Sequence, residues 1–432
     1  SALPDPSHTK SGNTAFRNIR VEFGTTLVHS RKISIRAMIE MEVGCENLIE
    51  EETAVDLESS ASIYKKQKPV NLLKLHTAKK DTYRIKEEIT IPGTKESIGQ
   101  VLLTDITGRK LEVRAAQDEL LLRGELQIFC MYLSEEGKTD WLEQSVPYEG
   151  RIECSGATEG MYYDVQHALE DTLADVRMDE DGEMRIIGIE GTVSLRINLY
   201  EEEELNLLED LYSLEQKVSY QTREAVYEEL LLQNQSKCKI VENLSLPELK
   251  DDVLQICHSS GSVQIEHVET RAEKQGGILI EGILHVSFLY LKADDALPFG
   301  NWQGMVPLSY LLECPDMPKD VRYQLSNRVE QISVTMTGSD SVEVKAVLDF
   351  DIFLRKEVPM QVITEVSLEE TDREELAKKP GIVGYMVKSG DDLWTLAKQY
   401  MTTEESIRQI NHLENGKIKP GDKLIICKEI GM

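Results

Sequence analysis

A run of carboxylates is the densest group of residues in the chain that could do chemistry. It extends from Glu201 to Glu204 and is followed by Glu209 and Asp210. A calcium loop needs alternating oxygen ligands and a closing Glu at its twelfth position, and this stretch has neither. Consecutive carboxylates usually form a solvated face. We therefore predict that this run is neither a metal site nor an acid–base pair.

The histidines and serines do not assemble a catalytic site either. His167, His258, His267 and His285 lie in strand-like segments, and none has the HExxH spacing of a zinc protease. The polar stretch 259–262 lacks the GxSxG sequence of a nucleophile elbow. We interpret these residues as surface or packing groups. The sequence predicts a protein that is not an enzyme and that needs no cofactor and no metal.

The cysteines indicate reduced thiols. They are odd in number and scattered, without a CxxC pair or a Cys/His cluster at zinc spacing: Cys45, Cys130, Cys154, Cys238, Cys257, Cys314 and Cys427. We expect them to be mostly buried. This usage favours a cytosolic compartment.

Length and charge limit the possible partners. The 432 residues predict about three domains. Acidic residues outnumber basic ones by 77 to 48, which gives a formal charge of −29. Such a field repels phosphate backbones and anionic lipid, so nucleic acid is excluded as a partner. No apolar run approaches the roughly 18 residues of a transmembrane segment.

Two long stretches repeat one another, which indicates tandem modules. The stretch from about Tyr83 to Leu231 aligns with that from about Lys237 to Glu370, and Gly124 aligns with Gly282. Trp141 and Trp302 recur at equivalent places in the two units, where we expect either a core anchor or a partner-binding spot. A third copy of the later half of the unit opens the chain, without a matching first half. We therefore expect the sequence to be truncated at its N-terminus.

The periodicity within these units is two, which is typical of strands with one buried face. Turn residues follow at Asp179–Gly182 and at Thr337–Asp340. The predicted fold is mainly β, with tandem antiparallel β-sandwich or barrel-like modules and a small C-terminal βααβ domain. The sequence does not decide between sandwich and barrel.

These observations predict five segments along the chain. Residues 1–71 are the second half of a truncated β module plus a linker, and 72–235 are a β module with a linker. Residues 236–370 are another β module, 371–381 a linker, and 382–432 the C-terminal domain. The parts expected to be linkers are 59–71, which is rich in lysine, and 220–235, which is polar with some helical spacing.

The C-terminal domain has the most specific pattern. Tyr385 and Val387 alternate as in a short strand, and Asp391 or Asp392 can cap a helix. Thr402 or Thr403 can cap a second helix, and residues 424–426 complete a second strand. The sequence SGDDLW near the start and N…L…I.PG..L near the end strongly resemble a LysM domain. The departure from that family is Asp392, where Thr is usual.

The resemblance to LysM implies a glycan-binding function. LysM domains bind glycans that contain N-acetylglucosamine, such as peptidoglycan or chitin, in a groove between the loop after the first strand and the loop before the last. By resemblance, the candidate glycan- or partner-binding residues are Gly390, Asp391, Asp392, Leu393, Asn411, His412 and Leu413. Each also has a purely structural interpretation: Asp391 as a helix cap, Leu393 and Leu413 as core, and Asn411 as a turn residue. Trp394 is predicted to be core.

The whole architecture resembles spore-coat morphogenetic proteins of clostridia and related Firmicutes, the SipL-like family. This resemblance implies a scaffold of spore coat and cortex assembly that acts in the mother-cell cytoplasm at the forespore surface. Its implied partner is the spore coat basement-layer ATPase or peptidoglycan. A peptidoglycan-binding anchor of the vegetative cell wall remains the alternative.

Overall fold

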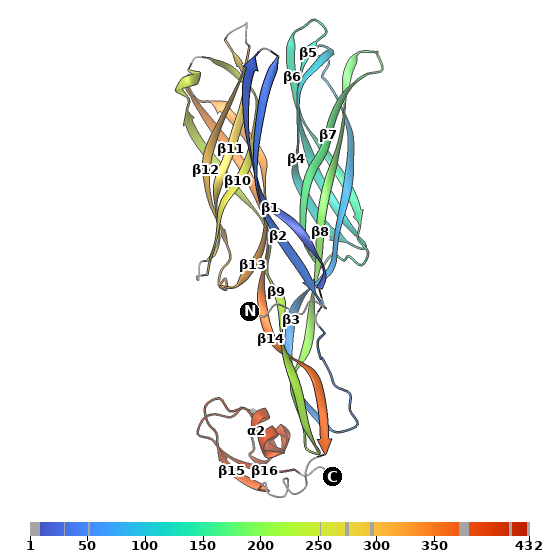
Figure 1. Ribbon diagram of the computed structural model, residues 1–432, viewed down its shortest axis with the longest axis vertical. Helices are drawn as coiled ribbons and strands as arrows, with labels where there is room; N and C mark the ends of the chain where they lie inside the picture. The colour runs from blue at the N-terminus through green and yellow to red at the C-terminus, as the bar shows by residue number, and fades with distance from the viewer. Residues whose placement is uncertain are drawn as a thin grey trace.

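The computed structural model describes residues 9–29, 31–50, 52–250, 252–272, 276–293, 298–370, 380–413 and 417–429. It shows an elongated molecule in which two β modules lie beside each other and long strands lead from them to the C-terminal domain (Figure 1). The fold is mainly β and antiparallel, as the sequence predicts.

The first β module consists of two three-stranded sheets. One has the order β4-β5-β6, with β4 Ile98–Ala116, β5 Glu119–Ser134 and β6 Thr139–Glu153. The other has the order β3-β8-β7, with β3 Ile63–Thr90, β7 Tyr162–Met178 and β8 Met184–Ser213. Among the described strands no ladder joins the two sheets, so the module is a sandwich and not a closed barrel.

The second β module repeats this topology strand for strand. Its sheets are β10-β11-β12 and β13-β14-β9. The strands are β9 Gln216–Ser245, β10 Val253–Arg271, β11 Gly277–Lys292, β12 Phe299–Glu313, β13 Val321–Met336 and β14 Ser341–Glu370, with a short 3₁₀ helix at Pro247–Leu249. In each module, the later sheet contains a β-hairpin, β7–β8 or β13–β14. This sheet covers the core from the side opposite to the sheet that precedes the hairpin in the sequence.

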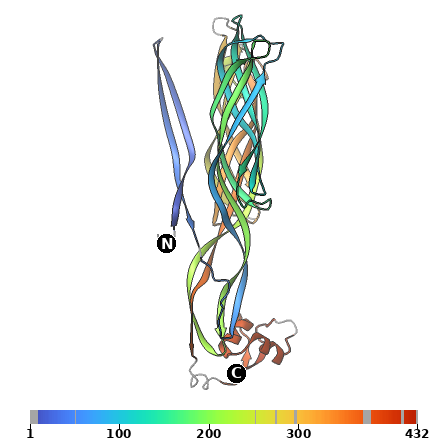
Figure 2. The ribbon, with the colours of Figure 1, turned by 90° about the vertical axis from the view of Figure 1, so that its right-hand side faces the viewer.

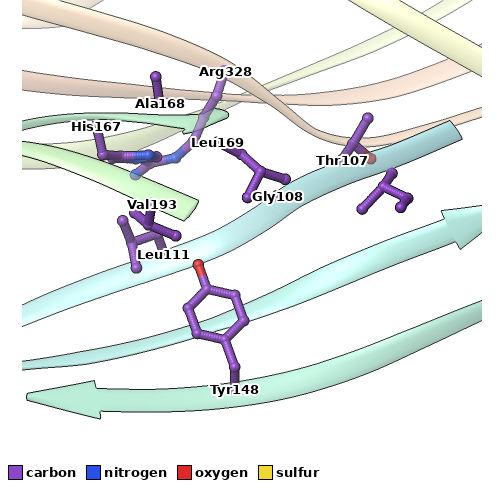
Figure 3. A pocket seen from close by; sticks show the side chains of 10 residues that line it. Thr107, Gly108, Leu111, Tyr148, His167, Ala168, Leu169, Val193 and Arg328 are labelled. Atoms are coloured by element: carbon purple, nitrogen blue, oxygen red, sulfur yellow. The ribbon is translucent and has the colours of Figure 1, made fainter. Parts of the chain in front are cut away.

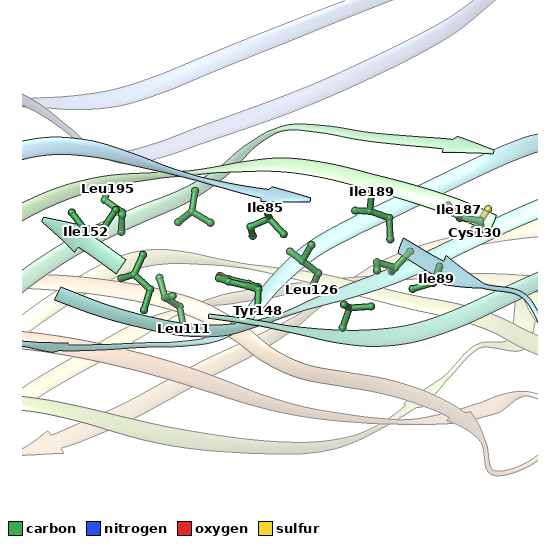
Figure 4. Packing of buried hydrophobic residues seen from close by; sticks show 14 of the residues in the cluster. Ile85, Ile89, Leu111, Leu126, Cys130, Tyr148, Ile152, Ile187, Ile189 and Leu195 are labelled. Atoms are coloured by element: carbon green, nitrogen blue, oxygen red, sulfur yellow. The ribbon is translucent and has the colours of Figure 1, made fainter. Parts of the chain in front are cut away.

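Alternating apolar residues of both sheets fill the core of each module. In the first, alternate residues of β5 from Leu120 to Tyr132 are almost fully buried and meet Ile187, Ile189 and Leu195 of β8 (Figure 4). Gly124 is needed among them because a Cβ there would lie 2.5 Å from the Tyr148 ring. The second module has a matching cluster centred on β11 and β14.

The four longest strands continue beyond the sandwiches as a stem. We define the stem as residues 63–75, 200–213, 216–232 and 353–370, which belong to β3, β8, β9 and β14. Three small apolar clusters hold its two ribbons together, one of them formed by Leu73, Tyr200 and Phe353. The prediction of linkers at 59–71 and 220–235 is wrong for most of these residues, since they form parts of β3 and β9.

The N-terminal residues form a separate hairpin. Strand β1 Thr9–His29 pairs antiparallel with β2 Lys32–Ile49 in a two-stranded sheet. Figure 2 shows this hairpin standing beside the modules and apart from them along most of its length. It corresponds in the repeat to β7–β8 and to β13–β14.

The C-terminal domain has the βααβ order expected from its sequence. It contains β15 Ile382–Met386, α2 Leu393–Tyr400, α3 Glu404–Ile410 and β16 Lys423–Cys427. The two strands pair antiparallel, and both helices contribute to one core with Leu396, Ala397 and Ile407. Most of the linker predicted at 371–381 lies outside the described residues.

Candidate glycan- or partner-binding site

Helix capping fixes the two loops that carry the candidate site. Asp392 is the N-cap of α2 and accepts a hydrogen bond from the Thr395 N–H at 2.7 Å. Thr403 caps α3 in the same way, accepting from the Ser406 N–H at 3.0 Å. Both caps satisfy donors that helices leave free at their first turn. The loop after β15 is therefore held at its junction with α2.

The candidates in this first loop are largely engaged within the protein. Asp391 accepts from the Tyr385 hydroxyl at 2.8 Å and from the Lys388 N–H at 2.7 Å. Asp392, besides capping α2, lies 3.5 Å from the Lys66 ammonium of the stem. Leu393 is a core residue at 5% exposure. Gly390 is exposed, with a φ of +91° that suits glycine, so its main chain is accessible.

In the second loop, Asn411 closes an edge of the sheet. Its amide nitrogen donates to the carbonyls of Ile407 and Ile425, each at 2.8 Å, and its oxygen accepts from the Ile425 N–H at 2.7 Å. Leu413 packs against the core. His412 is exposed in a left-handed conformation, with φ +52°. The Asn411 side chain thus satisfies the main-chain N–H and carbonyl of Ile425, which at the outer edge of β16 have no neighbouring strand to pair with.

The candidates of the first loop and those of the second loop bond to different parts of the protein. In the parts of the chain that the structure describes, no hydrogen bond or ion pair connects 390–393 to 411–413. The first loop is instead joined to the segment before β16, where Val387 exchanges main-chain hydrogen bonds with Gly421 and Asp422. Gly390 and His412 are the two exposed members of the predicted set.

The C-terminal domain packs against the end of the stem through contacts that were not predicted from the sequence. The Trp394 indole N–H donates to Asp210 at 2.8 Å, and the Lys398 ammonium donates to the same carboxylate. The Tyr212 ring packs edge-on against Trp394, with 4.9 Å between centroids, and its hydroxyl donates to the Thr402 carbonyl at 3.0 Å. One apolar core is therefore shared by the stem and the domain.

Asp210 is the electrostatic centre of this junction. Burial by itself raises the pKa of its carboxyl, but hydrogen bonds from Lys398, Tyr220 and Trp394 outweigh burial and lower the pKa below its usual value. The carboxylate therefore stays charged at neutral pH. Trp394, at 9% exposure, is a core residue as expected.

The outer face of the β15–β16 sheet is apolar and open. Ile382, Met386 and Ile425 are 70%, 58% and 52% exposed. They share one face because Gly384, which alternates with Ile382 and Met386, pairs directly with Ile425. This face belongs to the strands, whereas the contacts with the stem belong mainly to α2.

Two histidines outside this domain, His167 and His258, help to join the two β modules. His258 of the second module stacks on Phe129 of the first at 4.2 Å between ring centroids and lies 2.8 Å from a carboxylate oxygen of Asp105. His167 accepts a hydrogen bond from Arg328 across the same junction. Burial, with Arg328 beside it, lowers the pKa of His167 to about 4, so this ring is neutral at pH 7.

A small cavity of about 280 Å³ lies beside this pair (Figure 3). Its walls are mostly apolar, and Thr107, Tyr148, His167 and Arg328 provide the polar side chains. Arg328 is also engaged by Asp349 and Asp351, so its charge is compensated. The neutral His167 ring accepts its hydrogen bond from Arg328, so this nitrogen is not free to act as a base toward a ligand in the cavity.

Two carboxylates of the run at 201–204 bond to a lysine of the stem. Glu201 and Glu203 form an ion pair network with Lys74, each at 3.3 Å. Across the described residues, no group of three His, Cys, Asp or Glu side chains could hold a metal ion. Six cysteines are free thiols, of which Cys427 is partly buried and the others are buried: Cys130, Cys154, Cys238, Cys257 and Cys314.

The two repeated tryptophans occupy different faces, contrary to the expectation of equivalent places. Trp302 pairs with Phe288 and packs on the core of its own module. Trp141 pairs with Met131, on the face of β5 that points away from its own core. The strands pair in the same register in both modules, but Trp141 lies five residues before Val146 and Trp302 only four before Val306, so the two side chains point to opposite faces.

Comparison with known families agrees with this architecture. The SipL, SPOCS domain matches residues 97–177 and 252–337, and the LysM domain matches residues 385–426. The SPOCS segments contain β4 to β7 and β10 to β13, which are equivalent strands of the two modules. SPOCS and LysM are families of non-catalytic binding domains.

Neither the curated proteins nor the solved structures contain a match to the chain. Within the described part of the chain, no helix is long and apolar enough to cross a bilayer. The chain is a sporulation-associated protein that carries a duplicated SPOCS domain of the SipL type and a C-terminal LysM domain.

Proposed function

We propose that the protein is a non-enzymatic scaffold of spore envelope assembly. In this proposal the β modules act as a rigid column, and the LysM domain at its end docks to a coat morphogenetic protein, the coat basement-layer ATPase, or to peptidoglycan. The site of action is the forespore surface, on the mother-cell side, and later the spore coat.

The observation that best supports this proposal is the packing of the LysM domain against the stem. A scaffold has to present its docking domain at a defined distance and orientation from its other contacts. The junction between stem and LysM can fix that distance and orientation, because it combines polar and apolar contacts. They are the hydrogen bonds to the Asp210 carboxylate, the Tyr212–Trp394 ring pair and the Lys66–Asp392 ion pair. An adaptor that needed free movement would gain nothing from burying Trp394 there.

The contacts within LysM favour a protein partner over a glycan. Asp391, Asp392 and Asn411 already bond within the protein, so a sugar would depend mainly on main-chain groups near Gly390. The exposed apolar face of β15–β16 suits a protein surface, because sugars offer little apolar area in comparison.

The test compares the two ligands on the whole chain. We would measure retention of the coat ATPase from extracts of sporulating cells, and co-sedimentation with purified cortex peptidoglycan. Met386→Glu places a charge on the apolar face of β15–β16. His412→Asn changes the second loop with a residue that can adopt the same left-handed backbone conformation. Thr395→Glu is a control at an exposed position of α2. A protein partner predicts loss with Met386→Glu only. Retention of neither ligand by the unmodified chain would refute the proposal.

The alternative is a peptidoglycan-binding anchor of the vegetative cell wall, for which the LysM match is the supporting observation. It predicts that the chain sediments with sacculi from vegetative cells as well as with cortex. It also predicts that His412→Asn weakens binding and that Met386→Glu does not.

A further inference from the structure

Strand β15 of the LysM domain has an outer edge whose main-chain groups point away from the sheet. Asn411 occupies the outer edge of β16, where it bonds to both the N–H and the carbonyl of Ile425. These two groups of Ile425 therefore point away from β15. In an antiparallel ladder the opposite residue, Gly384, then points its own N–H and carbonyl away from β16. The same alternation applies to Ile382 and Met386.

The described residues leave these outward groups open to solvent. Ile382 and Met386 are 70% and 58% exposed, and Gly384, which consists of main chain alone, is exposed as well. Within 380–413 and 417–429, no main-chain hydrogen bond reaches the outer side of these three residues. An edge of this kind is a template for a further strand.

The edge strands of the two β modules, in contrast, all carry a feature that discourages added strands. β6 and β12 contain Pro147 and Pro307, which have no N–H to donate. β3, β4, β7, β9, β10 and β13 each have an extra residue at a register shift, which interrupts the edge. β15 pairs without a register shift and contains neither proline nor a charged residue. Its edge is therefore open in a way that the module edges are not.

The side chains beside this edge favour an apolar segment. Ile382 and Met386 lie on the same face as Ile425, and a Cβ added at Gly384 between them would meet nothing within 4 Å. A strand laid along β15 would place alternate side chains on this face, next to Ile382 and Met386. A peptide main chain also offers donors and acceptors at the spacing that the edge requires. The matching ligand is an extended protein segment with apolar residues at alternate positions.

We propose that an extended segment of the partner protein adds to β15 as a third strand of the β15–β16 sheet. The inference rests on the proposed function, in which LysM docks to a protein, and it specifies how the partner is held. Main-chain hydrogen bonds to Ile382, Gly384 and Met386 hold the segment, and the apolar face selects its side chains. Asn411 directs the segment to β15 because it already occupies the other edge of the sheet.

The test is hydrogen exchange with residue resolution on the full chain, alone and with the purified coat basement-layer ATPase as the probe. In the free chain the amides of Val383 and Tyr385, which bond to β16, should exchange slowly, whereas those of Gly384 and Met386 should exchange quickly. Binding should slow the exchange of Gly384 and Met386 at least ~10-fold, because the added strand accepts hydrogen bonds from both amides.

Two substitutions of Gly384 separate the main-chain donor from the side chain. Gly384→Pro removes an outward N–H, which an edge strand tolerates, and should raise the dissociation constant for the ATPase at least ~10-fold. Gly384→Ala keeps the N–H and places its Cβ in open space, so the dissociation constant should stay within about threefold. The amides of Leu424 and Ile426, opposite Tyr385 and Val383, should stay slow in both variants and show that the sheet persists.

Binding that leaves the Gly384 and Met386 amides unprotected overturns this inference but not the proposed function. So does a Gly384→Pro chain that binds as tightly as Gly384→Ala. Protection of these amides in the chain alone, as its concentration rises, would make a second copy the occupant and would also overturn the inference. A chain that does not bind the ATPase overturns the inference together with the protein partner of the proposed function.

Discussion

Replacing Asp210 with Asn should release the LysM domain from the stem. The carboxylate accepts hydrogen bonds from Trp394, Lys398 and Tyr220, and an amide keeps the shape but loses the charge and one accepting atom. A hydrogen bond to a charged group contributes about 1.5–3 kcal/mol. The Lys398 side chain is 37% exposed, so its share is at most about 1 kcal/mol.

The expected loss of docking free energy is therefore about 2 kcal/mol, or roughly 30-fold in the ratio of docked to undocked molecules. Trp394 reports on it directly, because its indole is 9% exposed in the docked state. In a background with Trp141→Phe and Trp302→Phe, Asp210→Asn should shift the emission of Trp394 to longer wavelength. Small-angle scattering should show a larger maximum dimension.

Glu209→Gln is the matched control. Glu209 is the neighbouring carboxylate, 48% exposed, with an ion pair to Lys66 at 3.3 Å. Its removal should change the docking free energy by less than about 1 kcal/mol. An unchanged emission spectrum for Asp210→Asn, or an equal shift for Glu209→Gln, would refute the role given to Asp210.

Three further predictions concern stability. Because the pKa of His167 falls from 6.5 unfolded to about 4 folded, the unfolded state binds a proton first as the pH drops. The unfolding free energy should fall by up to about 3 kcal/mol from pH 7 to pH 4, and urea titrations should show a weaker pH dependence for His167→Gln. Asn411→Ala removes three hydrogen bonds and should destabilise LysM by about 2–3 kcal/mol, measured by hydrogen exchange in β16, whereas the exposed His412→Asn should have little effect. Leu348→Ala should cost about 2–5 kcal/mol in thermal unfolding of the second module, since this side chain is fully buried, and an unchanged midpoint would contradict the assigned core.

Features that depend on short-range patterns could be predicted from the sequence. The caps of the LysM helices are set by residues within one turn, and Asp392 and Thr403 were both among the expected caps. The buried faces of β5 and β11 follow from strict alternation, because each strand has one face in a core.

Features that depend on distant pairing could not. Much of β9 is exposed on the stem, so its sequence lacks alternation, and its strand conformation depends on pairing with β14, more than a hundred residues later. Asp210 lies within a run of carboxylates, and only contact with Trp394 and Lys398 distinguishes it. The different faces of Trp141 and Trp302, in contrast, follow from the sequence, because Trp141 precedes Val146 by five residues and Trp302 precedes Val306 by four.

The most direct test of the scaffold proposal is retention of the coat ATPase and of cortex peptidoglycan by the full chain and by a chain that ends at Glu370. The account predicts that the full chain retains at least one of them and that the shortened chain, with both β modules still folded by circular dichroism, retains neither. Equal retention by the two chains would contradict it.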